Sequence, residues 1–384
     1  MKTLYALSES AYTTSAWYLK SLSGLQDAAA RQRIGVTLVK GASELDALEE
    51  LRTLVLIGSD SEWAGALVAS MRKRGVKVVL MGSSPNDFGA DVSGALFNRE
   101  TLVHDMVRYL RSSGRTHLAT LGHESNLVND NIRRHAFLSS ARQYGLDVDE
   151  RRDVYGITDD LAQCLLRFFE NLSRYDGVIC TNDYVAAELL VEARARGISV
   201  PERLFVCGSG NLMIGLCTTP TLTTSTLDYY ELGVQTMNIW NLLENNAGIV
   251  SVSVTIPCKI IPRESTACLN VPKDLPGAPH FASVAPAAPS DPTGLWLRKL
   301  EACLLNSDAL DRLLLSGVLR GMSTEKLAAQ LFVSPGTVQY RLRKLYAAVN
   351  APSRGEFVRM LSPYVAVTAL EVLKNEDMFP WNQQ

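Results

Sequence analysis

Residues 2–265 alternate between short β-rich runs and amphipathic stretches, and this alternation restricts the folds open to the chain more than any other feature. Segments 62–75 and 184–197 lie between such runs, and each ends in basic residues and a glycine, as helix C-termini commonly do. Strands that alternate with helices and are themselves apolar predict parallel sheets covered on both faces. We therefore predict an α/β fold with strands at 3–7, 34–40, 53–58, 76–82, 94–97, 116–122, 153–157, 177–181, 203–208 and 223–227.

The predicted strands fall into two groups of five, which favours two doubly wound, Rossmann-like lobes over one large sheet. After Thr266 the composition changes, because residues 267–294 are rich in Pro and Ala without a period, as in a semi-rigid linker. The predicted organisation is a two-lobed domain at 1–266, a linker at 267–294 and a small all-α domain at 295–384. Helices of that domain are expected at 295–305, 308–320, 323–331, 334–348 and 353–374.

Charge is distributed unevenly along the chain. The net charge of the 384 residues is −2, yet the window 312–359 contains eight Lys/Arg against two Glu. That window therefore carries +6 and the remainder of the chain −8. A basic patch on an acidic body is typical of a DNA-binding module joined to another domain.

Several other classes of protein are disfavoured. The seven cysteines are scattered and form no CxxC pair, which argues against disulfides or zinc and fits a reducing cytoplasm. The five histidines form no metal-binding motif, so neither a metal nor a cofactor is expected. The N-terminal sequence lacks the apolar segment of a secretion signal, and no apolar run is long enough to predict a membrane span. The expected location is the cytoplasm.

Segment 321–350 has the features of a helix-turn-helix at 323–348. Ser323 and Ser334 are predicted to cap its two helices, and Pro335 suits the first position of the second one. Leu327 and Ala328 on the first helix, and Val338, Leu342 and Leu345 on the second, are expected to face inward. The outward face of the second helix carries cations and no acid, which suits a DNA major groove. The expected DNA-binding residues are Ser334, Gly336, Thr337, Gln339, Tyr340, Arg341, Arg343 and Lys344.

The pattern G-M-S, L-A-x-x-L, V-S-x-x-T-V and L-x-x-L-Y in this segment resembles the C-terminal helix-turn-helix of LuxR/GerE-type regulators. The string T-V-Q-Y-R-L-R-K also resembles that of PucR-type regulators. The resemblance implies double-stranded DNA as the partner, with Gln339, Tyr340 and Arg343 reading bases. Thr337 and Lys344 are expected on phosphates. The alternative is a helical hairpin used for dimerisation, in which the cations are only solvated.

Polar side chains follow several of the predicted strands directly. Open α/β sheets bind ligands at the carboxyl ends of their strands, so we expect a small-molecule site there. Amides, carboxylates and an arginine are the groups that sugar hydroxyls need. For Asp60, Asn182 and Asp228 the alternative is a helix cap, and for Arg133 a solvated position. The expected ligand-binding residues are Ser10, Tyr12, Ser59, Asp60, Asn98, Arg133, Asn182, Asp183, Asn211 and Asp228.

Residues 174–266, from Y-D-G-V-I-C-T-N-D to I-P-R-E-S-T, resemble the effector domain of the lac-repressor family, and the likeness extends back through 96–122 and 133–145. The resemblance implies a type I periplasmic-binding-protein-like fold with three crossovers, near residues 97, 228 and 253, and a sugar-like effector. Arg133 matches the ligand-contacting arginine of that family, and Asn182 with Asp183 its Asn-Asp pair. The family carries its helix-turn-helix at the N-terminus, so a rearranged order of modules is expected here.

The combined prediction is a ligand-sensing transcription regulator that acts as a homodimer, paired through the sensor, the C-terminal helices or both. Gly210 stands where the family has a hydroxyl-binding aspartate, and Leu227 near its usual glutamine, so a sensor that binds a partner protein stays open as an alternative. A solute-binding transport protein is another, against which the absence of a secretion signal argues. An enzyme is not expected, because Ser209 lacks a G-x-S-x-G elbow.

Overall fold

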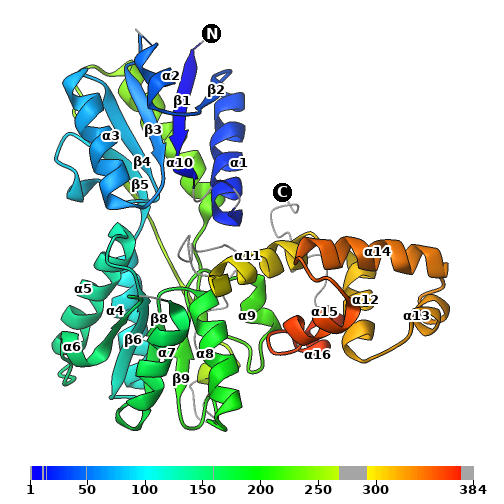
Figure 1. Ribbon diagram of the computed structural model, residues 1–384. Coiled ribbons are helices and arrows are strands. Elements are labelled where there is room, and N and C mark those ends of the chain that lie inside the picture. Colours follow the sequence, from blue (N-terminus) through cyan, green and yellow to red (C-terminus); the bar gives the residue numbers. More distant parts are fainter. Residues whose placement is uncertain are drawn as a thin grey trace. The chain divides into compact units, whose positions relative to one another are not determined.

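The computed structural model describes residues 2–10, 13, 15–48, 50–158, 160–267 and 292–372 (Figure 1). The chain divides into two compact units, each assembled from separate stretches of sequence. Unit 1 comprises Met1–Val107, His123–Gly145 and Leu227–Lys259, and unit 2 comprises Arg108–Gly122, Leu146–Thr226 and Ile260–Gln384. The crossovers expected near 97, 228 and 253 stay predictions; the unit boundaries that lie nearest to them follow Val107, Thr226 and Lys259.

Unit 1 is built on a six-stranded parallel sheet with the order β11-β5-β4-β3-β1-β2. Every residue of the central strand β3 is buried, as expected for a parallel sheet covered on both faces. The strands are β1 (Thr3–Ser8), β2 (Gly35–Val39), β3 (Thr53–Ile57), β4 (Lys77–Met81), β5 (Ser93–Phe97) and β11 (Ser253–Ile256). The helices are α1 (Ala16–Arg31), α2 (Ala42–Asp46), α3 (Ser61–Lys73), α4 (Arg99–Ser112), which continues into unit 2, α5 (Val128–Gln143) and α10 (Tyr229–Asn245).

Helices α1 and α10 pack against each other at very short range through two glycines. A Cβ atom at Gly233 would lie 1.9 Å from the backbone oxygen of Ser21, and one at Gly24 would lie 2.0 Å from that of Tyr230. Since no side chain fits in either place, only glycine permits this approach of the two backbones. The two helices are far apart in the sequence, so their packing joins the last segment of unit 1 to its first.

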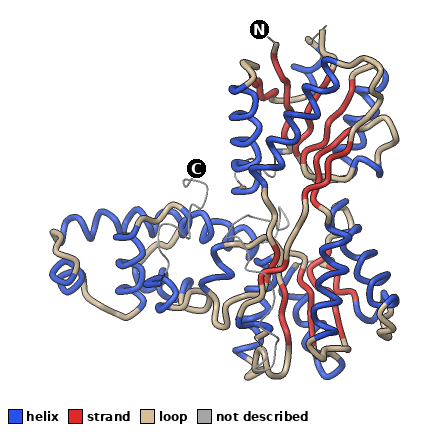
Figure 2. Tube along the Cα trace, turned by 180° about the vertical axis from the view of Figure 1, so that it is seen from behind, coloured by secondary structure: helices blue, strands red, loops and turns tan. Residues whose placement is uncertain are grey.

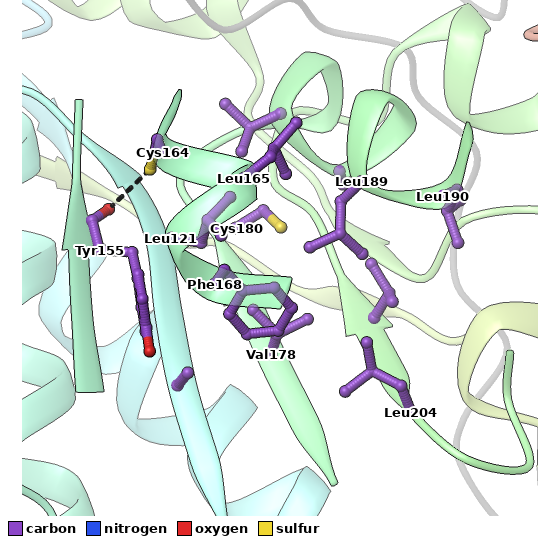
Figure 3. Close-up of a cluster of buried hydrophobic side chains, with 14 of the residues drawn as sticks. Leu121, Tyr155, Cys164, Leu165, Phe168, Val178, Cys180, Leu189, Leu190 and Leu204 are labelled. Atoms are coloured by element: carbon purple, nitrogen blue, oxygen red, sulfur yellow. Dashed lines mark hydrogen bonds between the residues drawn. The ribbon is translucent and has the colours of Figure 1, made fainter. Parts of the chain in front are cut away.

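Unit 2 contains a four-stranded sheet with the order β7-β6-β8-β9. Its hydrophobic core gathers Phe168 of α7, Cys180 of β8 and Leu189 of α8 over this sheet (Figure 3). A separate antiparallel pair joins β10 to β12. The elements are β6 (Leu118–His123), α6 (Glu150–Asp153), β7 (Val154–Gly156), α7 (Leu161–Glu170), β8 (Gly177–Cys180), α8 (Asp183–Ala195), β9 (Phe205–Cys207), α9 (Met213–Cys217), β10 (Thr224–Ser225) and β12 (Ile260–Ile261).

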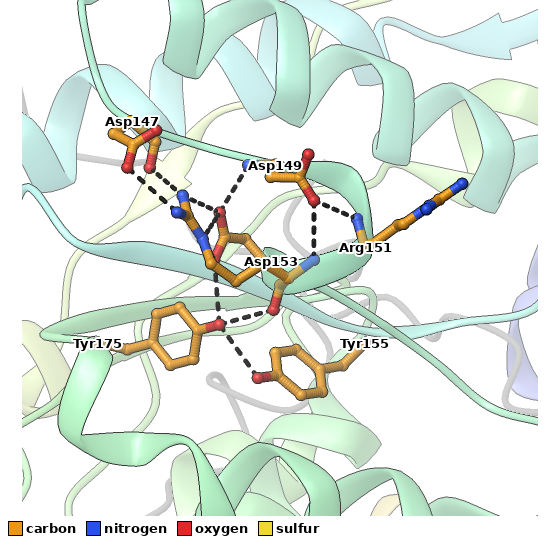
Figure 4. Close-up of polar contacts among 7 residues, drawn as sticks. Asp147, Asp149, Arg151, Asp153, Tyr155 and Tyr175 are labelled. Carbon is orange, nitrogen blue, oxygen red and sulfur yellow. Dashed lines mark hydrogen bonds and ion pairs between the residues drawn. The ribbon is translucent and has the colours of Figure 1, made fainter.

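A partly buried polar network lies beside the edge strand β7 of this sheet (Figure 4). Asp149 caps α6 by accepting hydrogen bonds from the amides of Arg151 and Arg152. The Asp153 carboxylate accepts hydrogen bonds from Arg152 at 2.9 Å and from the Tyr175 hydroxyl at 3.1 Å, and that hydroxyl also lies 3.0 Å from the Tyr155 hydroxyl. Because their polar groups have partners, Asp153, Tyr155 and Tyr175 can be buried without a large desolvation cost.

Beyond residue 291 the described chain is entirely helix and loop (Figure 2). Its first helix already begins at Pro292, inside the predicted linker, since proline suits the first helical position. Residues 268–291 of that linker lie outside the described residues, as do residues 373–384. The helices are α11 (Pro292–Leu305), α12 (Ala309–Leu319), α13 (Thr324–Gln330), α14 (Pro335–Ala348), α15 (Arg354–Leu361) and α16 (Val367–Val372).

The α/β fold with parallel sheets is confirmed, and each of the ten predicted runs contains a strand. The division into five and five is wrong. The unpredicted strand β11 joins the first sheet, whereas β10 leaves the second to pair with β12. The prediction of a single helix at 353–374 is also wrong. The structure has two helices there, α15 and α16, because Pro363 between them has no amide proton to continue the hydrogen bonds of α15.

Candidate functional site

Helices α13 and α14 are joined by a short turn, and each begins at a serine cap. The Ser323 hydroxyl accepts a hydrogen bond from the Lys326 amide, and the Ser334 hydroxyl accepts one from the Thr337 amide at 3.1 Å. In the turn, Phe332 has a φ of 54°, which reverses the chain direction within a few residues. Both predicted caps are therefore confirmed.

The inward face of this helix pair is apolar, as predicted. Leu327 and Ala328 of α13 are buried, and so are the residues at helical spacing on α14, namely Val338, Leu342 and Leu345. A pair of short helices locked by a shared core is a rigid support, so residues on the outer side of α14 are presented in a defined array.

The outward face of α14 is polar and basic. Gln339, Arg343 and Lys344 are exposed, and the helix contains no acidic residue. Neither Arg343 nor Lys344 forms an ion pair with any residue that the structure describes, so both charges face solvent. A row of amide and guanidinium donors on a capped helix is suited to base edges and phosphates.

Arg341 is oriented differently from its neighbours on α14. Its Nη1 atom donates to Asp308 at 2.7 Å and to Asp311 at 2.8 Å, and these two carboxylates form the capping box of α12. The ion pair raises the pKa of Arg341 and ties α14 to α12. We expected this guanidinium to face DNA. In the structure it serves the packing of the helices.

Two aromatic side chains are conspicuously exposed on the same helix pair. Phe332 in the turn is 95% exposed and Tyr340 on α14 is 72% exposed. Tyr340 is among the expected DNA contacts, whereas Phe332 is not. Exposure of this kind makes both rings accessible to a partner.

The helical segment is attached to the sheet-containing part of unit 2 by specific contacts. The buried Glu301 carboxylate of α11 accepts hydrogen bonds from the Met213 and Ile214 amides, both at 2.8 Å. The Tyr364 hydroxyl donates to Glu188 of α8 at 2.6 Å. Burial raises the pKa of Glu301 to about 7, although the two amides act in the opposite direction. Nothing in the local sequence of α11 indicated this role for Glu301.

In unit 1 most of the expected ligand residues also serve the fold. Asp60 caps α3, Asp228 caps α10, and the Asn98 side chain accepts from the Thr101 amide at the start of α4. These observations favour the helix-cap alternative for Asp60 and Asp228 without testing their ligand contacts. Ser59 is buried, and its amide donates a hydrogen bond to the Glu9 carboxylate. Ser10 is exposed, and Tyr12 lies outside the described residues.

Arg133, also in unit 1, is buried rather than solvated. It is 8% exposed, and its Nη1 donates to Asp130 at 2.7 Å. Arg99 is also buried in unit 1, and its positive charge and that of Arg133 repel each other. It is not among the residues expected from the sequence. Its only signal in the sequence was its position directly after Asn98, at the carboxyl end of β5.

In unit 2 the expected ligand residues are likewise engaged. Asn182 caps α8 by accepting from the Val185 amide at 3.0 Å. Asp183 is completely buried, and its carboxylate accepts from the Leu212 amide at 2.7 Å and the Thr224 hydroxyl at 2.6 Å. Burial raises the pKa of Asp183 to about 6, although these two hydrogen bonds act to lower it. The Asn211 side-chain oxygen accepts from Arg263. Asn182 therefore also fits the helix-cap alternative, and the ligand contacts of all three stay predictions.

The part of the chain that the structure describes contains no group of three His, Cys, Asp or Glu residues placed to bind a metal. Within the same residues, no helix is both long and apolar enough to cross a membrane.

Comparison with known proteins finds similarity to a periplasmic binding protein-like domain and to curated proteins named as transcription regulators. The family model of the periplasmic binding protein-like domain matches residues 107–266, which leaves α11–α16 outside the match. The NTD biosynthesis operon regulator NtdR of Bacillus subtilis is 37% identical over 94 residues, which is 24% of this chain and 29% of the regulator. The HTH-type transcriptional repressor CytR of Escherichia coli is 27% identical over 173 residues, or 44% of this chain and 50% of the repressor. The chain thus spans half or less of the length of these curated relatives.

Among solved structures, the transcriptional regulator CelR in its complex with cellobiose has the same fold. It superposes with a TM-score of 0.60 at 16% sequence identity, over 69% of this chain and 84% of that one. At this identity the likeness concerns the fold.

Proposed function

We propose that this chain is a cytoplasmic transcription regulator in which a periplasmic-binding-protein-like sensor controls a C-terminal helix-turn-helix of the LuxR/GerE type. The observation that carries the proposal is the outer face of α14, where Gln339, Arg343 and Lys344 are exposed on a capped helix free of acids. The similarity of the chain to NtdR and CytR, both regulators by name, supports it. Base contacts by Gln339, Tyr340 and Arg343 belong to this proposal.

Selection of bound sequences from a random DNA pool tests the proposal directly. The full-length protein is expected to enrich one motif with two half-sites, because helix-turn-helix proteins commonly bind as symmetric dimers. Sedimentation equilibrium with and without the selected DNA tests the homodimer. A protein that enriches no motif, at any salt concentration, does not have this function.

The effector in this proposal is a small polar metabolite of carbohydrate-like chemistry, bound by residues at the strand ends. CelR, which shares the fold, carries cellobiose in its solved complex. The alternative of a sensor that binds a partner protein gains support from Asp183 and Asn211, because both side chains are already bonded within the protein. A thermal-shift screen against sugars, polyols, purines and amino acids separates the two, since only a metabolite sensor is stabilised by a small molecule.

A further inference from the structure

Two arginines in unit 1 are buried and repel each other electrostatically. Arg99 is the first residue of α4, immediately after β5 and Asn98, and is 5% exposed. Arg133 lies on α5 and is 8% exposed. Both side chains are thus almost entirely removed from solvent. Burial lowers the pKa of Arg99 to about 10, and repulsion from Arg133 adds to this effect.

The two guanidinium groups differ in their partners. Arg133 donates to Asp130, whose other oxygen accepts from the Glu124 amide at 3.1 Å. Arg99 forms no hydrogen bond or ion pair with any residue in the described ranges. Its guanidinium lies over the Phe97 ring, 5.3 Å from the centroid, and this ring compensates only part of a full charge. The Nε atom of each arginine is enclosed without a hydrogen-bond partner.

The charge of this cluster does not balance. The strongest electrostatic influences on Arg99 come from Arg133, Tyr229, Cys258 and Asp130. Tyr229 is a phenol, and burial raises the pKa of the Cys258 thiol to about 11, so neither carries charge at neutral pH. Two buried cations therefore face one carboxylate. An uncompensated buried charge is unfavourable unless an ion of opposite sign joins it.

We propose that Arg99 and Arg133 form an anion-binding site for an acidic group of the effector. The effector is then a sugar acid or another metabolite with a carboxylate or phosphate, rather than a neutral sugar. Both oxyanions match the paired donors of a guanidinium group, and one negative charge balances the cluster. That the bound anion is the effector rests on the proposed function. The anion site itself does not depend on that function.

Thermal unfolding of the full-length protein tests the site with defined probes. Inorganic phosphate, glucuronate and glucose 6-phosphate are compared with glucose, all against sodium chloride of equal ionic strength. At least one anion is expected to raise the Tm of the wild type by about 2–4 °C, and glucose by less. The glucuronate and phosphate arms distinguish a carboxylate from a phosphate ligand. If no anion raises the Tm above the chloride control, the proposal is overturned.

Matched variants assign the effect to Arg99. Arg99→Met is expected to lose the anion-dependent shift and, in chloride alone, to be at least as stable as the wild type, because it removes a buried cation. Arg52→Met removes an exposed arginine of the same unit and is expected to keep the shift. An equal shift in Arg99→Met overturns the assignment. If that variant does not fold, Arg99→Lys is expected to bind the anion about tenfold more weakly, since lysine lacks the paired donors.

The outcome is separable from the test of the proposed function. DNA capture in chloride buffer without anion-dependent stabilisation overturns only the anion site. Anion-dependent stabilisation without capture of any DNA sequence overturns only the role as a regulator.

Discussion

The Glu301 carboxylate lies 2.8 Å from the backbone amide of Met213, although the two residues are 88 positions apart. Met213 begins α9, two residues after Asn211, an expected ligand contact. Glu301 belongs to α11, which packs against both α9 and α14. One buried carboxylate thus connects the start of α9 to α11, which in turn packs against the helix that carries the proposed DNA contacts. A shift of that loop on effector binding would act directly on the position of α11.

Replacement of Glu301 by alanine is expected to lower the free energy of unfolding by about 2–4 kcal/mol. The change leaves the amides of Met213 and Ile214 buried without acceptors, and each unsatisfied group costs about 1–3 kcal/mol. Urea denaturation of the full-length protein measures the effect. Glu170→Ala, which removes an exposed carboxylate from α7, is the control and is expected to have little effect. Equal stability of the two variants would show that Glu301 does not anchor the helices.

The contribution of Glu301 to stability depends on pH. Its pKa is about 7 in the folded chain against an ordinary 4.5, so between these values the folded state binds more protons than the unfolded state. The contribution is therefore fully present near pH 4.5 and falls as the pH rises toward 7. Glu301→Gln mimics the protonated form, so its stability relative to the wild type is expected to increase from pH 5 to pH 8, by on the order of 2–3 kcal/mol.

The comparison with the glutamine variant is needed because His123 changes the free energy of unfolding with pH in the opposite direction to Glu301. Burial lowers the pKa of His123 to about 4, so its contribution is lost as the pH falls from 6.5 toward 4. A difference between the wild type and Glu301→Gln that stays constant over pH 5–8 would contradict the assignment to Glu301.

Arg343 and Arg341 are neighbours on α14 with different expected roles. Arg343→Ala is expected to weaken specific DNA binding by about 1–3 kcal/mol and to relax the base preference at one position. Arg341→Gln breaks the ion pairs with Asp308 and Asp311, so it is expected to lower stability by about 1 kcal/mol while the selected motif stays the same. Selection of bound DNA and urea denaturation measure the two effects. A change in the DNA motif selected by Arg341→Gln would show that Arg341 contacts bases.

Lys344 is expected to contact phosphate rather than bases. Lys344→Ala should weaken binding to all DNA sequences alike and reduce the slope of log Kd against log salt by about one. Binding titrations at several salt concentrations give that slope. Lys73→Ala, which removes an exposed cation from unit 1, should leave it unchanged. A sequence-dependent loss in Lys344→Ala would place this side chain on a base instead.

Gly233→Ala is expected to destabilise unit 1 strongly, by about 2–4 kcal/mol, because the added Cβ would overlap the backbone of α1 at Ser21. Thermal unfolding measures the loss. Gly248→Ala provides the matched control, since a Cβ at that position meets no atom within 4 Å. If the two variants unfold at the same temperature, the close packing of α1 and α10 does not contribute to stability.

Local features of this protein followed from the sequence alone. The strands, the caps at Ser323 and Ser334, and the inward face of α14 depend on periodicity and on hydrogen bonds between near neighbours, so a short window contains the necessary information. The same reasoning failed for β10 and β11, because the sheet that a short strand joins depends on pairing with distant residues. Asp60, Asn182 and Asp228 were ambiguous for a related reason, since a cap and a ligand contact require the same side chains.

The basic face of α14 was visible in the sequence, but only the tertiary structure decided which of its cations are available. Arg341 is engaged by Asp308 and Asp311, which lie 33 and 30 positions away, and no periodicity of α14 could show this. The burial of Glu301 and Arg99 depends in the same way on segments far apart in the chain. Charge in a sequence has a sign but no environment, and the free energy of a charge is set by the solvent and partners that folding leaves to it.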